Sequence, residues 1–493
     1  MSQYPVLKPW INGQYLSNQT CDTVPLINPA NGQSTGALSV ATAATVDHAV
    51  AAARSALDQG WRTMAPMARA GVLKAVAAQL EAAAPQLAQA DCLDMGKPVS
   101  AGQFEAGVIA AGFFRYYAEA IDKRSMGSIA ATDNGVFEAQ VRRPRGVIAT
   151  IIPWNFPVVN LAMKVAPMLA AGNSVVLKPS ELASRSALLI GELAETAGLP
   201  SGVLNIVPGD GTTGDLLARH PGIDMLAFTG STRTGRSLMR AVGDSSLKPV
   251  LLECGGKSPE VVFADMGPDQ LSAIAGAIVN GAMANQGQVC VMRSRLYVED
   301  AIYPALIELI QQQLSAIQPA DPASASTQFG PLASRRQQLS VEAFIAQAER
   351  DGARLLLDGR GALANSGGCY VGPTLIETDD NQLDIVQQEV FGPVIAVQRF
   401  VGEEQAIALA NGTQYGLAAT IWTRDLGRAH RVSAAIDAGM TKVMAAPVQR
   451  MGAGFAHSAE ACKQSGFGIE GGLGALDSFS RLHAVEFHFA DDH

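Results

Sequence analysis

Short, continuous apolar runs alternate with helix-like stretches through the middle of the chain. Such runs are typical of parallel strands that helices cover on both faces of a sheet. Residues 147–257 contain a series of predicted strands, at 147–152, 174–177, 203–207, 225–228 and 248–252. Because strand and helix alternate, this half of the chain is predicted to fold as a doubly wound α/β sheet.

The ends of the chain show weaker patterns. Ala-rich sequence with helical apolar spacing predicts helices over 45–57 and 68–87, behind a Pro- and Gly-punctuated surface arm of residues 1–36. Residues 137–141 alternate like a strand, and so, loosely, does the tail at 478–489. A tail this apolar requires a sheet to join, and we expect that sheet to lie in another subunit.

One helix-like run stops abruptly before a cysteine. Apolar residues recur at helical spacing over 271–278, Asn285 and Gly287 break the pattern, and 295–298 reads as the next strand. Cys290 is therefore expected on a helix-to-strand connection. Backbone N–H groups there favour the thiolate of a nucleophile, whereas an inert buried cysteine is the alternative interpretation.

Composition and charge exclude several classes of protein. The chain has 493 residues, 48% of them hydrophobic and 16% charged, which predicts two or three domains and excludes disorder. A net charge of −9 gives no electrostatic basis for binding nucleic acid or an anionic membrane. The six cysteines show no C-x-x-C spacing, so neither a disulfide framework nor a metal site is predicted. Without a predicted signal peptide or membrane span, the cytoplasm is the expected location.

Two side chains at strand ends are candidates for chemistry, since ligands of parallel sheets bind at the carboxyl edge. Asn155 follows the first buried strand, where its amide would stabilise an oxyanion or, equally, cap the next helix. Glu253 stands at the end of another strand, where desolvation raises the pKa of a carboxyl toward that of a general base. Its alternative role is to lock the following Gly-Gly turn.

Three segments are candidates for nucleotide binding. Lys178 and Glu181 would bind ribose hydroxyls by hydrogen bonds, or else belong to the capped N-terminus of an ordinary helix. The G-x-G-x-x-G at 209–214 is a weak signal, because the acidic residue expected about 20 positions later is missing. The better phosphate loop is 228–235, where a helix amino end and Ser231 would face a pyrophosphate.

Six motifs in series resemble those of the NAD(P)-dependent aldehyde dehydrogenase superfamily, in order and rough spacing, over nearly the whole chain. They are Pro153-Trp154-Asn155-Phe156-Pro157, Lys178-Pro179-Ser180-Glu181, Phe228-Thr229-Gly230-Ser231, Glu253-x-Gly255-Gly256-Lys257, Gly287-Gln288-x-Cys290 and Glu389-x-Phe391-Gly392-Pro393. The resemblance implies an α/β, aldehyde dehydrogenase-like fold that assembles as a homodimer or homotetramer. Its expected parts are a Rossmann-like NAD-binding domain (1–122 and 146–256), an α/β catalytic domain (257–457) and a small β oligomerisation arm (123–145 and 475–493).

The resemblance also implies the catalytic roles. Cys290 would attack an aldehyde as a thiolate, and Asn155 and the Cys290 backbone N–H would hold the oxyanion. Hydride loss from the thiohemiacetal leaves a thioester, which a water activated by Glu253 would hydrolyse to the carboxylic acid.

The resemblance implies a cofactor site as well. The expected cofactor-binding residues are Trp154, Lys178, Ser180, Glu181, Gly230, Ser231, Gly255, Glu389 and Phe391. From the sequence alone, Glu389 reads first as an exposed loop acid. An acidic Glu181 beside the ribose repels a 2′-phosphate, which favours NAD, with NADP as the alternative because Lys178 and Ser180 would partly compensate.

Departures from the family pattern bear on the substrate. Met163, Ala284 and Ala453 stand where small-aldehyde members often carry aromatic residues, and Met440 and Met444 lie nearby in sequence. A roomier tunnel for a bulky apolar or aromatic aldehyde is predicted.

Other functions stay open at this point. In a semialdehyde dehydrogenase, Arg450 or His457 would receive a substrate carboxylate. A catalytically silent nucleotide-binding protein on the same fold is a further alternative. Glu253 argues against a coenzyme-A-acylating relative, and the lack of a histidine near the motifs argues against a cofactor-free hydrolase.

Overall fold

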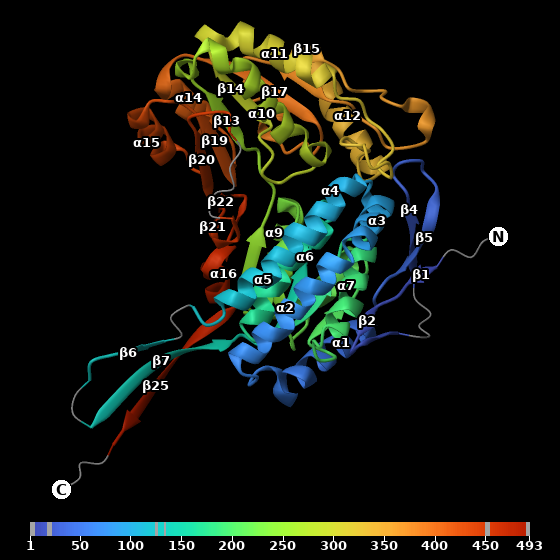
Figure 1. Cartoon of the computed structure of the whole chain (residues 1–493), viewed down its shortest axis with the longest axis vertical. Coiled ribbons are helices and arrows are strands. Elements are labelled where there is room, and N and C mark those ends of the chain that lie inside the picture. The colour runs from blue at the N-terminus through green and yellow to red at the C-terminus, as the bar shows by residue number, and fades with distance from the viewer. Residues whose placement is uncertain (1–4, 17–21, 124–126, 133–134, 449–453, 490–493) are drawn as a thin grey trace.

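The computed structural model describes residues 5–16, 22–123, 127–132, 135–448 and 454–489. Two lobes stack along the long axis of the molecule, and a narrow arm projects from the lower lobe (Figure 1). The lower lobe is formed mainly by the first half of the chain, whereas the upper lobe is formed by the later middle of the chain.

The lower lobe is built on a sheet that has eight strands in the described residues, in the order β23-β12-β11-β8-β9-β10-β2-β3. These strands are β2 (Trp10–Ile11), β3 (Gln14–Tyr15), β8 (Val147–Ile151), β9 (Ser174–Lys178), β10 (Leu204–Ile206), β11 (Met225–Thr229), β12 (Val250–Glu253) and β23 (Gly466–Phe467). Strands β8 to β12 pair in parallel. Every residue of β8, β9 and β11 is buried, as their apolar runs predicted.

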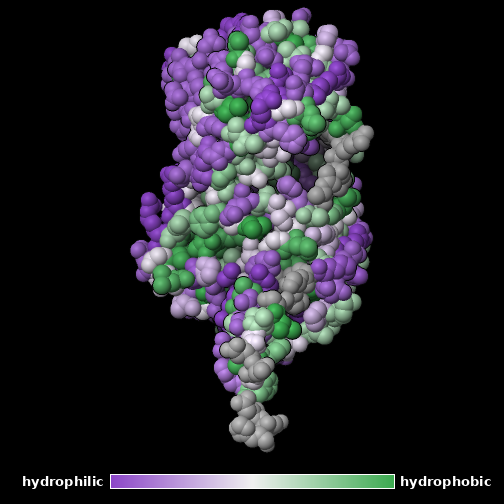
Figure 2. All heavy atoms as spheres, turned by 90° about the vertical axis from the view of Figure 1, so that its left-hand side faces the viewer, coloured by the Kyte–Doolittle hydropathy of each residue, from purple (hydrophilic) through white to green (hydrophobic). Residues whose placement is uncertain are grey.

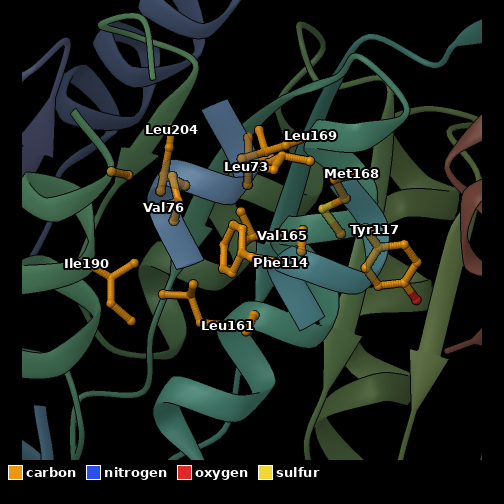
Figure 3. Packing of buried hydrophobic residues seen from close by; sticks show 14 of the residues in the cluster. Leu73, Val76, Phe114, Tyr117, Leu161, Val165, Met168, Leu169, Ile190 and Leu204 are labelled. Atoms are coloured by element: carbon orange, nitrogen blue, oxygen red, sulfur yellow. The ribbon is translucent and has the colours of Figure 1, made fainter. Parts of the chain in front are cut away.

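Helices cover both faces of this sheet. They are α1 (Ala43–Ala56), α2 (Pro66–Ala82), α3 (Ala84–Met95), α4 (Val99–Phe104), α5 (Ala111–Ala120), α6 (Pro157–Ala170), α7 (Arg185–Thr196), α8 (Gly211–Arg219), α9 (Thr232–Ser245) and α16 (Gly472–Ser478), with π-helical turns at Leu57–Trp61 and Glu105–Ala110. Figure 3 shows the main core, where Leu73 of α2, Phe114 of α5 and Val165 of α6 pack together. This packing fixes α6, which follows β8 directly.

The upper lobe contains a sheet with seven strands in the described residues, ordered β15-β16-β17-β14-β13-β19-β20. Its strands are β13 (Pro259–Val262), β14 (Arg295–Glu299), β15 (Arg354–Leu357), β16 (Thr374–Glu377), β17 (Val394–Phe400), β19 (Ala418–Trp422) and β20 (Met440–Met444). Its helices are α10 (Leu271–Met283), α11 (Tyr303–Ser315), α12 (Arg335–Arg350), α13 (Asp384–Gln387), α14 (Gly402–Asn411) and α15 (Leu426–Ala435). All these strands pair in parallel except β15, which runs antiparallel at the edge.

Short sheets complete the molecule. Strands β1 (Val6–Leu7), β4 (Thr23–Ile27) and β5 (Ser34–Ser39) form an outer sheet at the amino terminus, while β18 (Tyr415–Gly416) pairs with β22 (Cys462–Lys463) and β21 (Ala459–Glu460) with β24 (Ile469–Glu470). The segment after β20 thus returns to the lower lobe, where β23 joins the edge of the large sheet beside β12.

The projecting arm consists of β6 (Gly127–Ile129), β7 (Val136–Pro144) and β25 (Ser480–His488). The tail strand β25 pairs antiparallel with β7 of the same chain, from Ser480 opposite Pro144 to His488 opposite Val136. The expectation that its sheet lies in another subunit was therefore wrong. Strand β7 is long enough to pair with the whole of β25 within one chain. The alternation of residues along the tail could not reveal a partner strand more than 300 residues away in sequence.

Candidate active site

The candidate residues of the lower lobe meet at one edge of its sheet. Asn155, Lys178, Ser231 and Glu253 lie at or just beyond the carboxyl ends of β8, β9, β11 and β12. The strand order reverses between β8 and β11, because β9 and β10 extend to one side and β12 to the other. Ligands of open α/β sheets bind outside such a switch point.

Cys290 lies on the loop between α10 and β14, on the side of the upper lobe. Upstream of it, Asn285 and Gln286 adopt left-handed φ angles of 48° and 57°. A Cβ on Gly287 would lie 2.2 Å from the Gly392 carbonyl oxygen, so only glycine allows this close approach. The loop therefore holds a strained, fixed conformation of the kind that clusters at functional sites.

Two hydrogen bonds join this loop to Asn155 of the lower lobe. The Asn155 amide Nδ2 donates to the Gln288 carbonyl at 2.9 Å, and Asn285 Nδ2 donates to the Asn155 carbonyl at 2.9 Å. The Gln288 side chain accepts from the Ala333 N–H at 2.9 Å. Because an amide nitrogen has two N–H groups, Asn155 keeps one donor for a ligand.

The Cys290 thiol is less acidic than the sequence suggested. Burial, followed by the negative charges of Glu253 and Glu389, raises its pKa to about 12. The backbone N–H groups of Val291 and Cys290 lower the pKa, as expected of the loop, but they are outweighed. The thiol therefore needs a base to become a nucleophile.

Glu253 is suited to be that base. Burial, and after it the nearby Glu470 carboxylate, raise its pKa to about 8 against the opposing charge of Lys164. Lys164 of α6 and Glu470 of β24 form a buried ion pair with each other. Proton transfer from Cys290 to Glu253 would move a negative charge within the site without adding one, which limits its electrostatic cost.

Glu389 packs against the turn that follows Glu253. Its Oε1 accepts from the Gly256 N–H at 3.0 Å, and a Cβ on Gly255 would lie 2.0 Å from its Oε2. Burial raises the pKa of Glu389 to about 7, while the Gly256 N–H and the charge of Lys257 lower it. Glu389 is thus a half-buried acid beside the site, and the reading as an exposed loop acid was wrong.

An aromatic pair crosses the same junction. The Trp154 and Phe391 rings meet edge to face with centroids 5.3 Å apart. Gln337 of α12 donates from Nε2 to the Phe391 carbonyl at 2.8 Å and to the Val390 carbonyl at 3.2 Å. Sequence reasoning missed Gln337, because nothing local distinguishes a glutamine on a helix from a solvated one.

The nucleotide candidates lie on both sides of the switch point, with Lys178 at the end of β9 and Ser231 just beyond β11. Lys178 is buried, donates from Nζ to the Pro179 carbonyl at 3.0 Å, and has a pKa lowered by burial. Ser180 Oγ lies 3.4 Å from Glu181 Oε2. Ser231 caps α9 by accepting from the Thr234 N–H at 3.2 Å, and the Gly230 N–H donates to the Glu253 carbonyl at 3.0 Å.

The substrate-related positions are more scattered. Met163 is half-buried on α6, Ala284 is exposed beside the catalytic loop, and His457 is exposed. Arg450 and Ala453 lie outside the described residues. The structure also contains an aromatic contact that the sequence did not predict. Phe455 packs edge to face on Phe113 of α5 with centroids 4.9 Å apart.

The described ranges offer neither a metal-binding cluster nor a membrane-spanning helix. They contain no cluster of three or more His, Cys, Asp or Glu side chains placed to hold a metal ion. Nor does any helix within them have the length and apolar character needed to cross a bilayer.

Comparison with known proteins decides the family. The model for the aldehyde dehydrogenase family matches residues 15–485. The chain belongs to the aldehyde dehydrogenase family. The resemblance of its six motifs, its α/β fold class and its assignment as an enzyme of this oxidoreductase class are thereby confirmed, and the catalytically silent alternative is set aside.

Individual relatives of this aldehyde dehydrogenase are similar over almost their full length. It is 42% identical over 479 residues to the NADP/NAD-dependent aldehyde dehydrogenase PuuC of Escherichia coli, covering 97% of this chain and 94% of that protein. It is 37% identical to a 2-hydroxymuconic semialdehyde dehydrogenase of a Pseudomonas strain, over 97% and 99% of the two chains. The solved structure of a mutant P. syringae AldA indole-3-acetaldehyde dehydrogenase, in complex with NAD+ and IAA, matches with a TM-score of 0.93 and 38% identity, covering 98% and 96%.

Proposed function

We propose that this enzyme oxidises an aldehyde to the carboxylic acid with NAD, or alternatively NADP, through a covalent intermediate on Cys290. One observation supports this most. Glu253 and Glu389 both act electrostatically on the Cys290 thiol, so nucleophile, base and ribose-binding acid share one site. Complexes of relatives with NAD+ support the cofactor.

The first step is attack on the carbonyl. Glu253 accepts the thiol proton, and Cys290 Sγ bonds to the aldehyde carbon as the carbonyl electrons move to oxygen. The free N–H of Asn155 and the backbone N–H of Cys290 donate to this oxyanion. The Asn155–Gln288 bond keeps the amide beside the loop that carries the sulfur.

The second half releases the acid. When bound, the cofactor supplies the acceptor for the hydride that leaves the thiohemiacetal carbon. Glu253, after returning its proton to solvent, takes a proton from water as the oxygen attacks the Cys290 thioester. The carboxylic acid departs, and the sulfur leaves as a thiolate that is protonated again.

The residues at the switch point fit a dinucleotide. The amino end of α9, capped by Ser231, would face the pyrophosphate. Gly230, which has no side chain, would let the pyrophosphate come close to the backbone there. Lys178, Ser180 and Glu181 would hold the adenosine ribose. Glu389 would hold the nicotinamide ribose against Gly255, where a Cβ would collide with its carboxylate, and Trp154 and Phe391 would pack on the nicotinamide side.

The proposed substrate is a bulky apolar or aromatic aldehyde. The small or flexible residues Met163 and Ala284, and the nearby aromatic pair Phe113–Phe455, support an apolar tunnel. A relative's name, indole-3-acetaldehyde dehydrogenase, points the same way. The semialdehyde alternative, with His457 or Arg450 as carboxylate receptor, is supported by the 2-hydroxymuconic semialdehyde relative.

We further propose a homodimer or homotetramer that forms through the projecting arm. Ile129, Leu482 and Phe487 on this arm are 71%, 58% and 49% exposed. Figure 2 shows hydrophobic residues along the arm at the foot of the molecule. A second copy that covers them would remove apolar surface from water.

The test is NADH or NADPH formation, followed by absorbance, over aliphatic, aromatic and ω-carboxylated aldehydes without coenzyme A. Reduction of NAD with aromatic or long aliphatic aldehydes is expected. Preference for ω-carboxylated aldehydes would instead establish the semialdehyde alternative. A strict requirement for coenzyme A would contradict hydrolysis by Glu253.

A further inference from the structure

A cavity of about 520 Å³ lies where the two lobes meet. Its walls come from β4 and the turn after it, from the turn before α7, and from the start of α12. Figure 1 shows α12 at the lower end of the upper lobe, facing α3 and the outer sheet of the lower lobe. The lining includes Glu181 from the lower lobe and Arg335 and Arg336 from the upper lobe. One of the nucleotide candidates therefore shares a cavity with two positive charges of the other lobe.

These two arginines have no counter-charge of their own. Both are exposed, and in the part of the chain that the structure describes neither forms an ion pair with a carboxylate. Asp94, which also lines the cavity, is paired instead with Arg185, whose Nε donates to Asp94 Oδ1 at 2.7 Å. Arg335 and Arg336 stand in the first turn of α12, where the helix dipole disfavours positive charge. An anion in the cavity would offset both charges.

The other polar groups beside Glu181 are already engaged. Lys178 is 4% exposed, and its Nζ donates to the Pro179 carbonyl at 3.0 Å. Ser180 Oγ accepts from the Leu182 N–H at 3.3 Å. Both side chains are thus bonded within the turn that carries Glu181, whereas the guanidinium groups of α12 are exposed.

A phosphate on a ribose suits this combination of charges. Under the proposed function Glu181 holds the adenosine ribose, and NADP differs from NAD only by a phosphate on the 2′-oxygen of that ribose. The 2′- and 3′-oxygens sit on neighbouring carbons, so an acid that binds the 3′-hydroxyl keeps the 2′-phosphate nearby. Glu181 repels this phosphate, whereas a guanidinium binds phosphate through two parallel N–H groups.

We propose that Arg336, with Arg335 beside it, binds the 2′-phosphate of NADP in this cavity. The upper lobe then supplies the positive charge that allows NADP to bind despite Glu181. Arg336 is the main donor, because Arg335 Nη1 already donates to Gln338 Oε1 at 2.6 Å. The inference rests on the proposed function, which places the adenosine ribose at Glu181. NAD has no 2′-phosphate and does not need either arginine.

The experiment measures equilibrium binding of NADPH and NADH, which differ only in the 2′-phosphate, by the fluorescence of the reduced nicotinamide without any aldehyde. In Arg336→Gln we expect the Kd for NADPH to rise roughly 10-fold or more, and the Kd for NADH to stay as in the wild type. Arg350→Gln, in the last turn of the same helix, is the matched control and should change neither Kd. Equal changes for both cofactors in Arg336→Gln, or no change, would overturn the proposal.

A crystal structure of the unaltered enzyme with NADP bound gives a second test. It should show a guanidinium nitrogen of Arg336 within hydrogen-bond distance of the 2′-phosphate, and a phosphate held by Lys178 instead would contradict the proposal. The outcomes also separate the two levels of the argument. A wild type that neither binds nor reduces NAD or NADP would refute the proposed function. A wild type that reduces NAD, together with an Arg336→Gln variant that binds NADPH as tightly, would refute only the role of Arg336.

Discussion

The side-chain amide of Asn155 donates to the backbone carbonyl of Gln288 at 2.9 Å, across the junction of the two lobes. Asn155 follows the central strand of one sheet, and Gln288 stands two residues before Cys290 on a loop of the other lobe. The group proposed to bind the oxyanion is therefore tied to the loop that carries the proposed nucleophile. Such preorganisation is what makes oxyanion binding effective.

Asn155→Ala tests this relationship. We expect kcat to fall by about 10²–10³-fold, because a donor to the oxyanion and the link to the loop are both lost. Asn205→Ala, which removes another buried asparagine from β10, should alter stability but leave kcat near that of the wild type. Equal kcat values for the two variants would contradict the role of Asn155.

Cys290→Ala should abolish covalent catalysis. NADH formation is expected to fall by roughly 10³-fold or more, since oxyanion binding alone cannot replace the nucleophile. Cys369→Ala, at a buried cysteine away from the Cys290 loop, is the control and should retain activity. Mass spectrometry of enzyme quenched during turnover should detect the acyl adduct on Cys290 only.

Glu253→Gln should remove the pH dependence near neutrality. A base must be deprotonated to act, so wild-type activity should rise with pH through about 8, the raised pKa of Glu253. In the variant, kcat should fall by about 10²–10⁴-fold, and the rise of activity with pH should disappear. If the activity of the variant still rose with pH with a midpoint near 8, the rise would have to come from the titration of another group.

Lys257→Met should change how cofactor binding responds to pH. Burial lowers the pKa of Lys257 itself to about 7, and in its charged form Lys257 lowers the pKa of Glu389, so its removal should raise the pKa of Glu389 above about 7. Glu389 would then be neutral over more of the neutral range, and KM for NAD should increase there and recover at higher pH. Lys248→Met, which removes a buried lysine bonded to the Ala218 and His220 carbonyls, should leave this profile unchanged.

Arg295→Leu should destabilise the upper lobe. The buried guanidinium donates to the carbonyls of Lys257, Leu409 and Ala410 and to the Tyr297 hydroxyl. Leaving these acceptors unpaired should lower the free energy of unfolding by about 3–5 kcal/mol, measured by chemical denaturation. Arg336→Leu, on an exposed residue of α12, should change it by less than about 0.5 kcal/mol.

Much of the lower lobe was predictable because its strands are buried on both faces. The apolar runs that form β8 and β9 have no polar face. The strands could therefore be recognised without deciding which side of each strand faces the core. The strand expected from Lys248 begins instead at Val250, because the Lys248 ammonium bonds two carbonyls at the end of α8. A lysine in a sequence does not reveal such partners.

The electrostatics of the candidate site could not be predicted from the motifs. The motifs marked Cys290 and Glu253, but the pKa of a thiol depends on every charge that folding brings near it. Glu470 lies more than 200 residues from Glu253 and carries no motif, yet it acts on that carboxyl directly. Left-handed Asn285 and Gln286 are likewise set by the packed loop, since either residue adopts ordinary backbone angles elsewhere.

The two-residue strand β23 has a consequence for biosynthesis. Glu253 sits on β12, whose outer neighbour is supplied by Gly466 and Phe467, near the end of the chain. Domains fold as the ribosome releases them, at about 5–20 residues per second. The strand that carries Glu253 would therefore lack its outer neighbour for roughly 10–40 seconds during synthesis. A chain truncated before residue 466 should contain both Cys290 and Glu253 but lack the strand that completes this edge of the sheet.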